Sequence, residues 1–392
     1  MPALPLARSR KKLRILLSGM LAGDPHQGGA TWAVLQYILG LLQLGHDVYF
    51  VEPVAANKIP ACERAASATS SYFSAVVRQF GLEARAALLT RGGTKTIGLP
   101  YDSLRAIAAQ TDLLINISGM LSDPALLDPI PVRLYLDLDP GFNQLWQAVE
   151  HIDMGFGGHT HFATVGLAIG GTDCDIPTCG LTWIPTPQPV VLSEWPAGER
   201  VTIDAFTTVG NWRAYGSITY RGVFYGQRAH TLRRFVGLAG RTNQRFLLAV
   251  AIHPDEVEDL ARLRAGRWQL ADPVREAGTP DAYRAFLQRS KAEIGIAKSG
   301  YAASRSGWFS DRSACYLASG RPVVTLETGF SRFLPTGRGL FAFQTEDDAL
   351  AAIDTVAGNF GQHSRTARAL AEEYFDSGRV LPALLDRIGV SA

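Results

Sequence analysis

The residues best suited to bind an anion gather in the second half of the chain. Ser310, Asp311 and Arg312 open a short expected helix, whose free backbone amides and dipole favour a negative charge. Arg305 and Arg312 can donate charge-assisted hydrogen bonds to phosphate oxygens, and Lys298 ends an earlier strand as a further phosphate cation. The simpler interpretation is that Asp311 only stabilises the first helical turn and that Arg312 is a surface residue.

Two more candidates follow the first strand of that half. The segment VTIDAFTTVGNW places Gly210 and Asn211 at the carboxyl end of the strand. Ligands of parallel α/β sheets bind at this end, so we expect both residues close to a bound diphosphate.

A loop near the start of the chain, AGDPHQGGATW, carries a candidate base. Asp24 and His26 lie in it, and a neutral histidine can deprotonate an acceptor hydroxyl because its pKa lies near working pH. Gly28 and Gly29 would let backbone approach a ligand at a helix N-terminus. The G-x-G-x-x-G fingerprint is missing, which disfavours NAD although Glu52 lies at the end of the second strand. The alternative for His26 is a loop histidine bonded to backbone.

Carboxylates recur where the segment YLDLDPGF ends. Asp137 and Asp139 share one face of a strand end, where paired carboxylates can hold a metal or act as acid and base. Asp-Pro-Gly after a strand is also a common turn. Cys174 and Cys179 are too loosely spaced with the nearby histidines for zinc. We therefore expect no bound metal.

Alternating apolar runs and helical segments must position these residues. In the first half we expect strands at 13–19, 46–53, 111–119 and 132–140, helices at 31–45 and 65–80, and a Gly- and Thr-rich loop after the second helix. In the second half we expect strands at 201–212, 245–254, 267–273, 292–300, 321–327 and 339–345, and helices at 255–264, 280–289 and 310–319. A proline-rich stretch at 184–196 predicts a stiff connector between the two halves. The pattern predicts an α/β protein with two Rossmann-like, doubly wound parallel-sheet domains facing a cleft.

Composition bounds the class of protein. The 392 residues are 47% hydrophobic and 19% charged, as in a globular protein with a large core. A net charge of only +2 argues against nucleic acid as the main partner, so we expect no stable nucleic-acid complex. The apolar run at 15–22 reads as a strand rather than a signal peptide, and no window reaches the roughly 18 apolar residues of a membrane span. Four cysteines without a CxxC pair indicate reduced thiols in a cytoplasmic protein.

The run SDRSACYLASGRPVV, followed by TGFSRFLPTGRGLFAF and EDDALAAI, resembles the donor-site segment of GT-B glycosyltransferases. It is most similar to the family 1/family 4-like group and its CgeB-type relatives. GGATWAVLQYILGLLQLGHDVYFVE resembles the opening βαβ unit on the acceptor side of that group, and RALAEEYFDSGRVLPALLDRIG resembles its final helices. The resemblance implies an acceptor domain at 1–193 with a basic tail at 1–12, a donor domain at 194–357, and helices at 358–392 that cross back.

The resemblance also implies roles for further residues. A histidine such as His159 or His161 would contact a sugar or phosphate, and the loop ADPVREAGTPDAY, with Arg275 and Tyr283, would lie beside the nucleotide base. One departure is that the acids of the family's E-x7-E pair align with Gly307 and Cys315 here.

We therefore expect a metal-independent glycosyltransferase, with no cofactor beyond a nucleotide-diphospho sugar as co-substrate and with a hydroxyl acceptor of unknown identity. The alternatives are a catalytically inactive nucleotide-sugar-binding or scaffold protein, a sugar epimerase, and a DNA-modifying transferase on the same fold.

Overall fold

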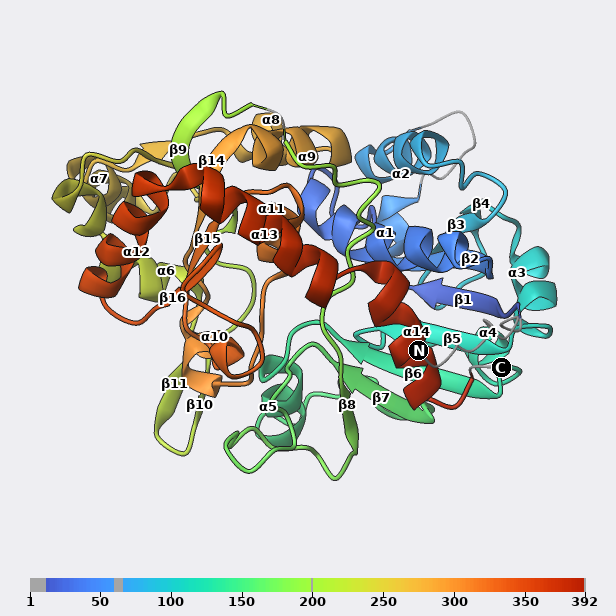
Figure 1. Ribbon diagram of the computed structural model, residues 1–392. Helices are drawn as coiled ribbons and strands as arrows, with labels where there is room; N and C mark the ends of the chain where they lie inside the picture. Colours follow the sequence, from blue (N-terminus) through green and yellow to red (C-terminus); the bar gives the residue numbers. More distant parts are fainter. Residues whose placement is uncertain (1–11, 60–65, 199, 391–392) are drawn as a thin grey trace, which may run out of the picture.

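The computed structural model describes residues 12–59, 66–198 and 200–390. Cys62 and the predicted basic tail, apart from Lys12, lie outside the described residues. Figure 1 shows two sheets side by side, each covered by helices, with the C-terminal helices running from one to the other. The predicted pair of doubly wound α/β units is confirmed.

The first sheet has eight strands. They are β1 (Arg14–Ser18), β2 (Asp47–Val54), β3 (Ala86–Thr90), β4 (Thr96–Gly98), β5 (Leu113–Ile117), β6 (Val132–Asp137), β7 (His161–Thr164) and β8 (Trp183–Pro185). Their order is β4-β3-β2-β1-β5-β6-β7-β8, and only β4 is antiparallel to its neighbour. The order reverses between β1 and β5, which makes their carboxyl ends a ligand-binding crevice.

Helices cover both faces of this sheet (Figure 1). They are α1 (Gly28–Gln43), α2 (Ala68–Gln79), α3 (Tyr101–Ala108), α4 (Pro124–Leu127) and α5 (Phe142–Ala148). The α2 helix begins with a capping box, in which Ser67 and Ser70 satisfy each other's backbone amides.

The second sheet is entirely parallel. Its strands are β9 (Ile203–Asn211), β12 (Phe246–Ala251), β13 (Gln269–Leu270), β14 (Ser290–Gly295), β15 (Val323–Leu326) and β16 (Leu340–Phe343). Their order is β13-β12-β9-β14-β15-β16, so the reversal falls between β9 and β14. A hairpin of β10 (Ile218–Tyr220) and β11 (Val223–Tyr225) extends after β9.

Nine helices of the described chain belong to the second half. They are α6 (Arg228–Leu232), α7 (Val257–Ala265), α8 (Pro273–Ala277), α9 (Pro280–Arg289), α10 (Ser299–Ser304), α11 (Asp311–Ala318), α12 (Glu346–Gly358), α13 (Phe360–Tyr374) and α14 (Ser377–Arg387). Gly320 has the left-handed conformation expected after α11 (φ 66°). Ser310 occupies the N-cap position of α11 without a capping hydrogen bond.

The two halves are joined by buried contacts. The indole nitrogen of Trp32 on α1 donates to the carbonyl of Pro280 on α9 at 2.9 Å. The Trp32 ring also packs edge-on against Trp195 in the connector, with the ring centroids 5.0 Å apart. α13 packs against α11, and α14 packs against α1 (Figure 1). These contacts hold the carboxyl ends of the sheets across one cleft.

Several expected element boundaries were wrong. The predicted Gly- and Thr-rich loop contains β3 and β4, and β8 includes the first residues of the predicted connector. Pro53 does not end its strand, because β2 continues to Val54. Proline is tolerated there because the pairing with β1 stops at Val51, which leaves a strand neighbour on one side only.

Candidate functional site

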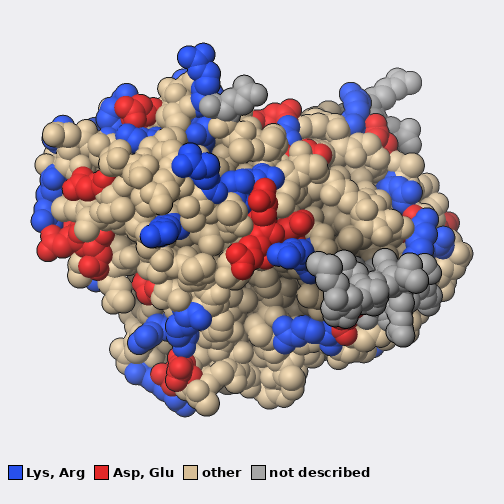
Figure 2. Space-filling view, in the orientation of Figure 1, with Lys and Arg blue, Asp and Glu red and all other residues tan. Residues whose placement is uncertain are grey.

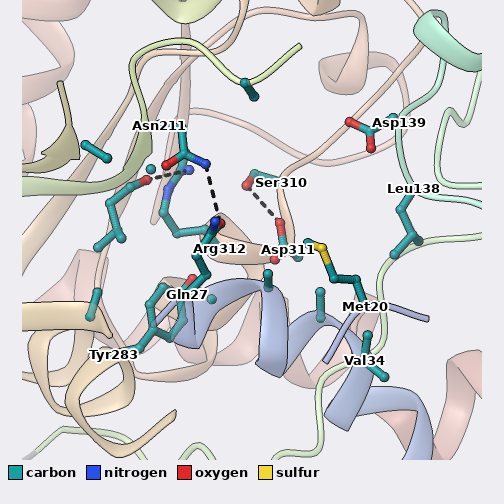
Figure 3. A pocket seen from close by; sticks show the side chains of 18 of the residues that line it. Met20, Gln27, Val34, Leu138, Asp139, Asn211, Tyr283, Ser310, Asp311 and Arg312 are labelled. Carbon is teal, nitrogen blue, oxygen red and sulfur yellow. Dashed lines mark hydrogen bonds between the residues drawn. The ribbon is translucent and has the colours of Figure 1, made fainter. Parts of the chain in front are cut away.

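A cleft of about 670 Å³ lies where the two sheets face each other (Figure 3). One wall comes from the segments that follow β1, β5 and β6 and from the start of α1. The opposite wall comes from the end of β9, the segment after β14, and the starts of α6 and α11. The crevices where the strand order reverses, between β1 and β5 and between β9 and β14, therefore open into the same cleft.

Arg228 is a buried cation of this cleft, fixed by two backbone carbonyls. It opens α6, is 6% exposed, and donates from Nη1 to the Ile296 carbonyl at 2.8 Å and from Nε to the Asn211 carbonyl at 3.2 Å. Burial, followed by the charge of Arg312, lowers the pKa of Arg228. A Cβ atom at Gly210 would lie 2.9 Å from Nη2 of Arg228, so the glycine makes room for the guanidinium.

Arg312, 8% exposed in the first turn of α11, forms a second cation of the same wall. Its Nε donates to Glu293 Oε1 at 2.6 Å and its Nη1 donates to the Val209 carbonyl at 3.0 Å. Burial opposes the charge, but the Glu293 carboxylate outweighs it and raises the pKa of Arg312. Glu293 Oε2 is buried without a hydrogen-bond partner among the described residues. The simpler interpretation of Arg312 as a surface residue is therefore wrong.

Lys298 belongs to the wall formed by the second half and contacts Asp139 on the opposite wall. Its Nζ is 3.6 Å from the ring centroid of Tyr215 and 3.6 Å from Asp139 Oδ1. The side chain is 15% exposed, and burial lowers its pKa to about 8 although Asp139 opposes this shift. The amine is therefore expected to lose its proton, and with it its positive charge, just above neutral pH.

Asp139 accepts hydrogen bonds from the hydroxyls of Tyr215, at 2.7 Å, and Tyr301. Burial raises its pKa, but the charge of Lys298 and the hydroxyl donors outweigh that effect, so the pKa is lowered. The carboxylate belongs to the first sheet and its three partners belong to the second. Asp139 thus bridges the cleft.

Asp137, its expected partner, does not face the cleft. It is fully buried at the end of β6 and accepts from Asn143 at 2.7 Å, Gln144 at 2.8 Å and Thr164 at 2.7 Å. Burial raises the pKa of Asp137 to about 6 despite these donors. The carboxylate anchors the start of α5 to β7, so the predicted acid and base pair does not form.

The loop that carries the predicted base is held by a buried acid. Glu52 is fully buried and accepts from the backbone amides of Ala22 at 2.8 Å and Gly23 at 2.7 Å, and burial raises its pKa to about 7. His26 lines the cleft with a left-handed backbone (φ 65°). Asp24 is exposed and does not line the cleft, and its carboxylate accepts a hydrogen bond from the side-chain amide of Gln27.

Gly28 and Gly29 lie where the two halves of the chain approach each other closely around α1. A Cβ at Gly28 would lie 2.3 Å from the Thr279 carbonyl oxygen, and one at Gly29 would lie 2.9 Å from the Tyr283 ring. Only Gly29 also lines the cleft. The predicted close approach is therefore real, but its partner is the second half of the chain.

Four further candidates line the cleft, as the sequence predicted. Asn211, Ser310 and Asp311 line the cleft (Figure 3), and so does Gly210. Asn211 Nδ2 donates across the cleft to Gln27 Oε1 at 3.4 Å. Ser310 donates to the Asp311 carboxylate at 3.3 Å, and burial raises the pKa of Asp311.

Three further candidates, besides Asp24, Gly28 and Asp137, lie away from the cleft lining. His159 contacts Asn116 Nδ2 at 3.0 Å, and burial lowers its pKa. His161 begins β7, at the amino end of the sheet, and pairs with Thr160 at 2.9 Å. Arg305 caps α10 in the left-handed conformation (φ 47°) and its side chain is exposed. None of these lines the cleft.

Of the two residues expected beside the nucleotide base, one lines the cleft and the other does not. Tyr283 is buried and lines the cleft, whereas Arg275 is exposed and pairs with Glu276 at 2.8 Å. A tyrosine ring can therefore contact a ligand there, and Arg275 cannot be assigned to the cleft.

Neither position of the missing E-x7-E acids faces the cleft. Gly307 has φ 74°, and a Cβ there would lie 3.0 Å from the backbone nitrogen of Ala168. Cys315 is 3% exposed, with its Sγ 3.6 Å from Gln36 Nε2 of α1. The first half of the chain occupies the space into which such acids would point.

Sequence reasoning missed Arg228, Glu293, Tyr215 and Tyr301. Glu293 had a signal, because a carboxylate inside the apolar run AEIGIA must have a buried partner. Arg228 had none, since an arginine at the start of a short helix is common on surfaces.

No group of three or more His, Cys, Asp or Glu side chains that could hold a metal occurs in the described ranges. Among those same residues, no helix has the length and apolar character needed to span a membrane.

Neither a protein-family model nor a curated protein matches this chain. Solved structures do. An alpha-glucosyltransferase in complex with UDP and a mismatch-containing DNA is 11% identical, with a TM-score of 0.60, over 96% of this chain and 99% of that chain. Sucrose-phosphate synthase from Thermosynechococcus elongatus and Anabaena HepE in complex with UDP and glucose are each 11% identical, with TM-scores of 0.56, over 96% of this chain and 99% of theirs. These likenesses show the fold: the chain has the two-domain GT-B architecture, as the sequence resemblance predicted.

Proposed function

We propose that this protein is a glycosyltransferase that moves a sugar from a nucleotide-diphospho sugar to an acceptor hydroxyl. The observation that carries the proposal is the convergence of Arg228, Lys298 and Arg312 on one wall of the cleft, at the switch point of the second sheet. Arg312 already pairs with Glu293 and Lys298 lies beside Asp139, but the described partners of Arg228 are only backbone carbonyls. A buried cation without a counter-charge is costly unless it meets an anion. A diphosphate bound at this wall would supply that anion, with oxygens for charge-assisted hydrogen bonds.

The same residues supply the chemistry. Attack of the acceptor oxygen on the anomeric carbon forms one C–O bond and breaks the bond to the diphosphate. The leaving diphosphate carries the developing charge, which Arg228, Lys298 and the N-terminus of α11 are placed to stabilise. This arrangement supports metal-independent transfer, since fixed protein charges take the place of a cation.

His26 is the candidate group for the acceptor proton. It enters the cleft from the first sheet, opposite the cations, on a loop held by Glu52. A neutral imidazole there can accept the hydroxyl proton as the new bond forms. Asp139 is less suited to this task because it is already engaged by two hydroxyls and Lys298.

The first test is donor binding. Several structures of similar fold contain UDP, and UDP with glucose in one case, so UDP and UDP-sugars come first, followed by GDP, ADP and dTDP compounds. Binding to the native state must raise the melting temperature by mass action. We expect Arg228→Met to abolish the rise, Lys298→Met to reduce it, and the exposed Arg262→Met on α7 to preserve it. No rise up to millimolar ligand would overturn the proposal.

Turnover separates an enzyme from an inactive binding protein. We expect His26→Ala to abolish transfer while the donor-induced rise in melting temperature persists. A wild-type protein that binds donor but neither transfers nor hydrolyses it with any acceptor would favour the nucleotide-sugar-binding alternative.

A further inference from the structure

The two walls of the cleft differ in charge. All three cations that line it, Arg228, Lys298 and Arg312, come from the second sheet and its helices. Among the described residues of the first half, no lysine or arginine lines the cleft. The acceptor side therefore offers no counter-charge to an anionic molecule.

The first wall is instead built from apolar side chains. Figure 3 shows Met20, Val34 and Leu138 together on that side of the pocket. Three further apolar residues of the wall are Ala33, Ile117 and Met120. They come from α1, from the end of β5, and from the segments after β1, β5 and β6. Separate parts of the chain therefore contribute apolar side chains to this wall.

Two of the four methionines in the chain belong to this wall. Met20 lines the cleft and is 36% exposed, so its side chain is open to contact with a ligand. Methionine is flexible and polarisable, and it adapts to apolar ligands of varied shape.

The polar groups of this wall are few. They are the neutral side chains Gln27, Ser118 and Gln188 together with His26, and the engaged carboxylate Asp139. An apolar surface with a few convergent hydrogen-bonding groups is typical of a site for a small, mostly apolar molecule.

We propose that the acceptor is an uncharged, largely apolar compound with a free hydroxyl, such as a phenol or a long-chain alcohol, seated against Met20, Met120 and Leu138. This inference rests on the proposed transferase function. It excludes phosphorylated acceptors and nucleic acid, because binding of a phosphate backbone depends on several lysine or arginine contacts. On the face of the molecule in Figure 2, basic and acidic side chains are interspersed rather than gathered into a basic track.

The test measures acceptor binding and transfer separately. The fluorescent phenol 4-methylumbelliferone is titrated by anisotropy, and transfer is followed by mass spectrometry with the donor that raises the melting temperature. Glucose 6-phosphate and a DNA duplex with a hydroxymethylated base are the charged competitors. We expect saturable binding and glycosylation of the phenol and neither for the charged compounds.

Matched variants place the binding on this wall. Met20→Gln and Met120→Gln change polarity without adding charge beside the donor, and we expect each to weaken phenol binding at least about fivefold, in line with the cost of burying an unpaired amide. Met20→Leu, and Val257→Gln on the exposed face of α7, should leave it within about twofold. The donor-induced melting shift should be unchanged in all four.

The outcomes separate the two proposals. Glycosylation of the phosphorylated sugar or DNA but not the phenol, or phenol binding indifferent to both glutamine variants, would overturn the acceptor class while the donor shift still supports the transferase. Loss of the donor shift in the wild type would instead sink the transferase, whatever the phenol titration shows.

Discussion

The carboxylate of Asp139, just beyond β6 of the first sheet, accepts a hydrogen bond at 2.7 Å from the hydroxyl of Tyr215, which follows β9 of the second sheet. Tyr301 donates to the same oxygen, and Lys298 lies 3.6 Å from it. The two halves are therefore tied together inside the cleft by one charged group. The same contact also occupies a lysine that we assign to the donor diphosphate, so donor binding and domain contact share a residue.

Removing Asp139 should loosen this contact. Asp139→Ala leaves Lys298 without its counter-charge and two tyrosine hydroxyls without an acceptor. Hydrogen bonds to charged groups contribute about 1.5–3 kcal/mol each, and the partial exposure of Asp139 reduces this, so we expect a loss of about 2 kcal/mol in the free energy of unfolding. Urea unfolding measures it, with the exposed Asp354→Ala as control. A loss no greater than that of the control would show that the bridge contributes nothing to stability.

Donor binding should depend on pH through Lys298. Burial lowers the pKa of this amine to about 8, so it is charged below that value and neutral above it. Bound diphosphate requires the charged form, so affinity for UDP should change little below about pH 7 and fall roughly tenfold by about pH 9. Isothermal titration across this range tests the expectation. Lys298→Met should bind more weakly and lose the dependence; an unchanged pH profile in that variant would assign the titration to another group.

The sequence predicted the long central elements well. The α9 helix was placed at its observed bounds, and Lys298 and Asn211 were found because they follow strands whose carboxyl ends meet at the cleft. The missed strands β3, β4, β7, β8, β10 and β11 have three to five residues each. Such strands depend on neighbours for their stability, and their own sequence pattern is too short to reveal them.

Site residues were harder to predict because strand ends do not determine side-chain direction. Asp137 and Asp139 are two residues apart, yet one anchors α5 and the other bridges the cleft. Arg305 was expected beside Arg312, but its left-handed backbone turns the side chain out. Arg228 is brought to the cleft by the path of the chain after the β10–β11 hairpin, which no local pattern indicates.

Arg312 should matter for stability as well as binding. Arg312→Met leaves the Glu293 carboxylate buried without its ion-pair partner, which typically costs 3–5 kcal/mol. Adding Glu293→Gln removes the uncompensated charge, so the double variant should recover most of that loss. Urea unfolding of both single variants and the double variant gives the coupling energy. Additive losses would contradict the pairing, and only the double variant would be a fair test of donor binding.

Restoring the family's missing acid should harm the fold. Cys315 is 3% exposed and contacts Gln36 of α1, so Cys315→Glu would place a carboxylate and extra volume in a closed contact. We expect the free energy of unfolding to fall by more than about 2 kcal/mol, with no gain in donor affinity. Cys315→Ala should cost less than half of this. Tighter UDP binding by Cys315→Glu would instead mean that this position reaches the ribose.

The glycine at the start of α1 should be intolerant of a methyl group. A Cβ at Gly28 would lie 2.3 Å from the Thr279 carbonyl oxygen and 2.7 Å from that of Ala277, both backbone atoms of the second half. Gly28→Ala must therefore push the halves apart, lowering the melting temperature and, because Gly29 and His26 line the cleft beside it, donor affinity and transfer. Gly157→Ala is the matched control, since a Cβ there meets no atom within 4 Å. Equal behaviour of the two variants would show that the close approach at Gly28 does not set the width of the cleft.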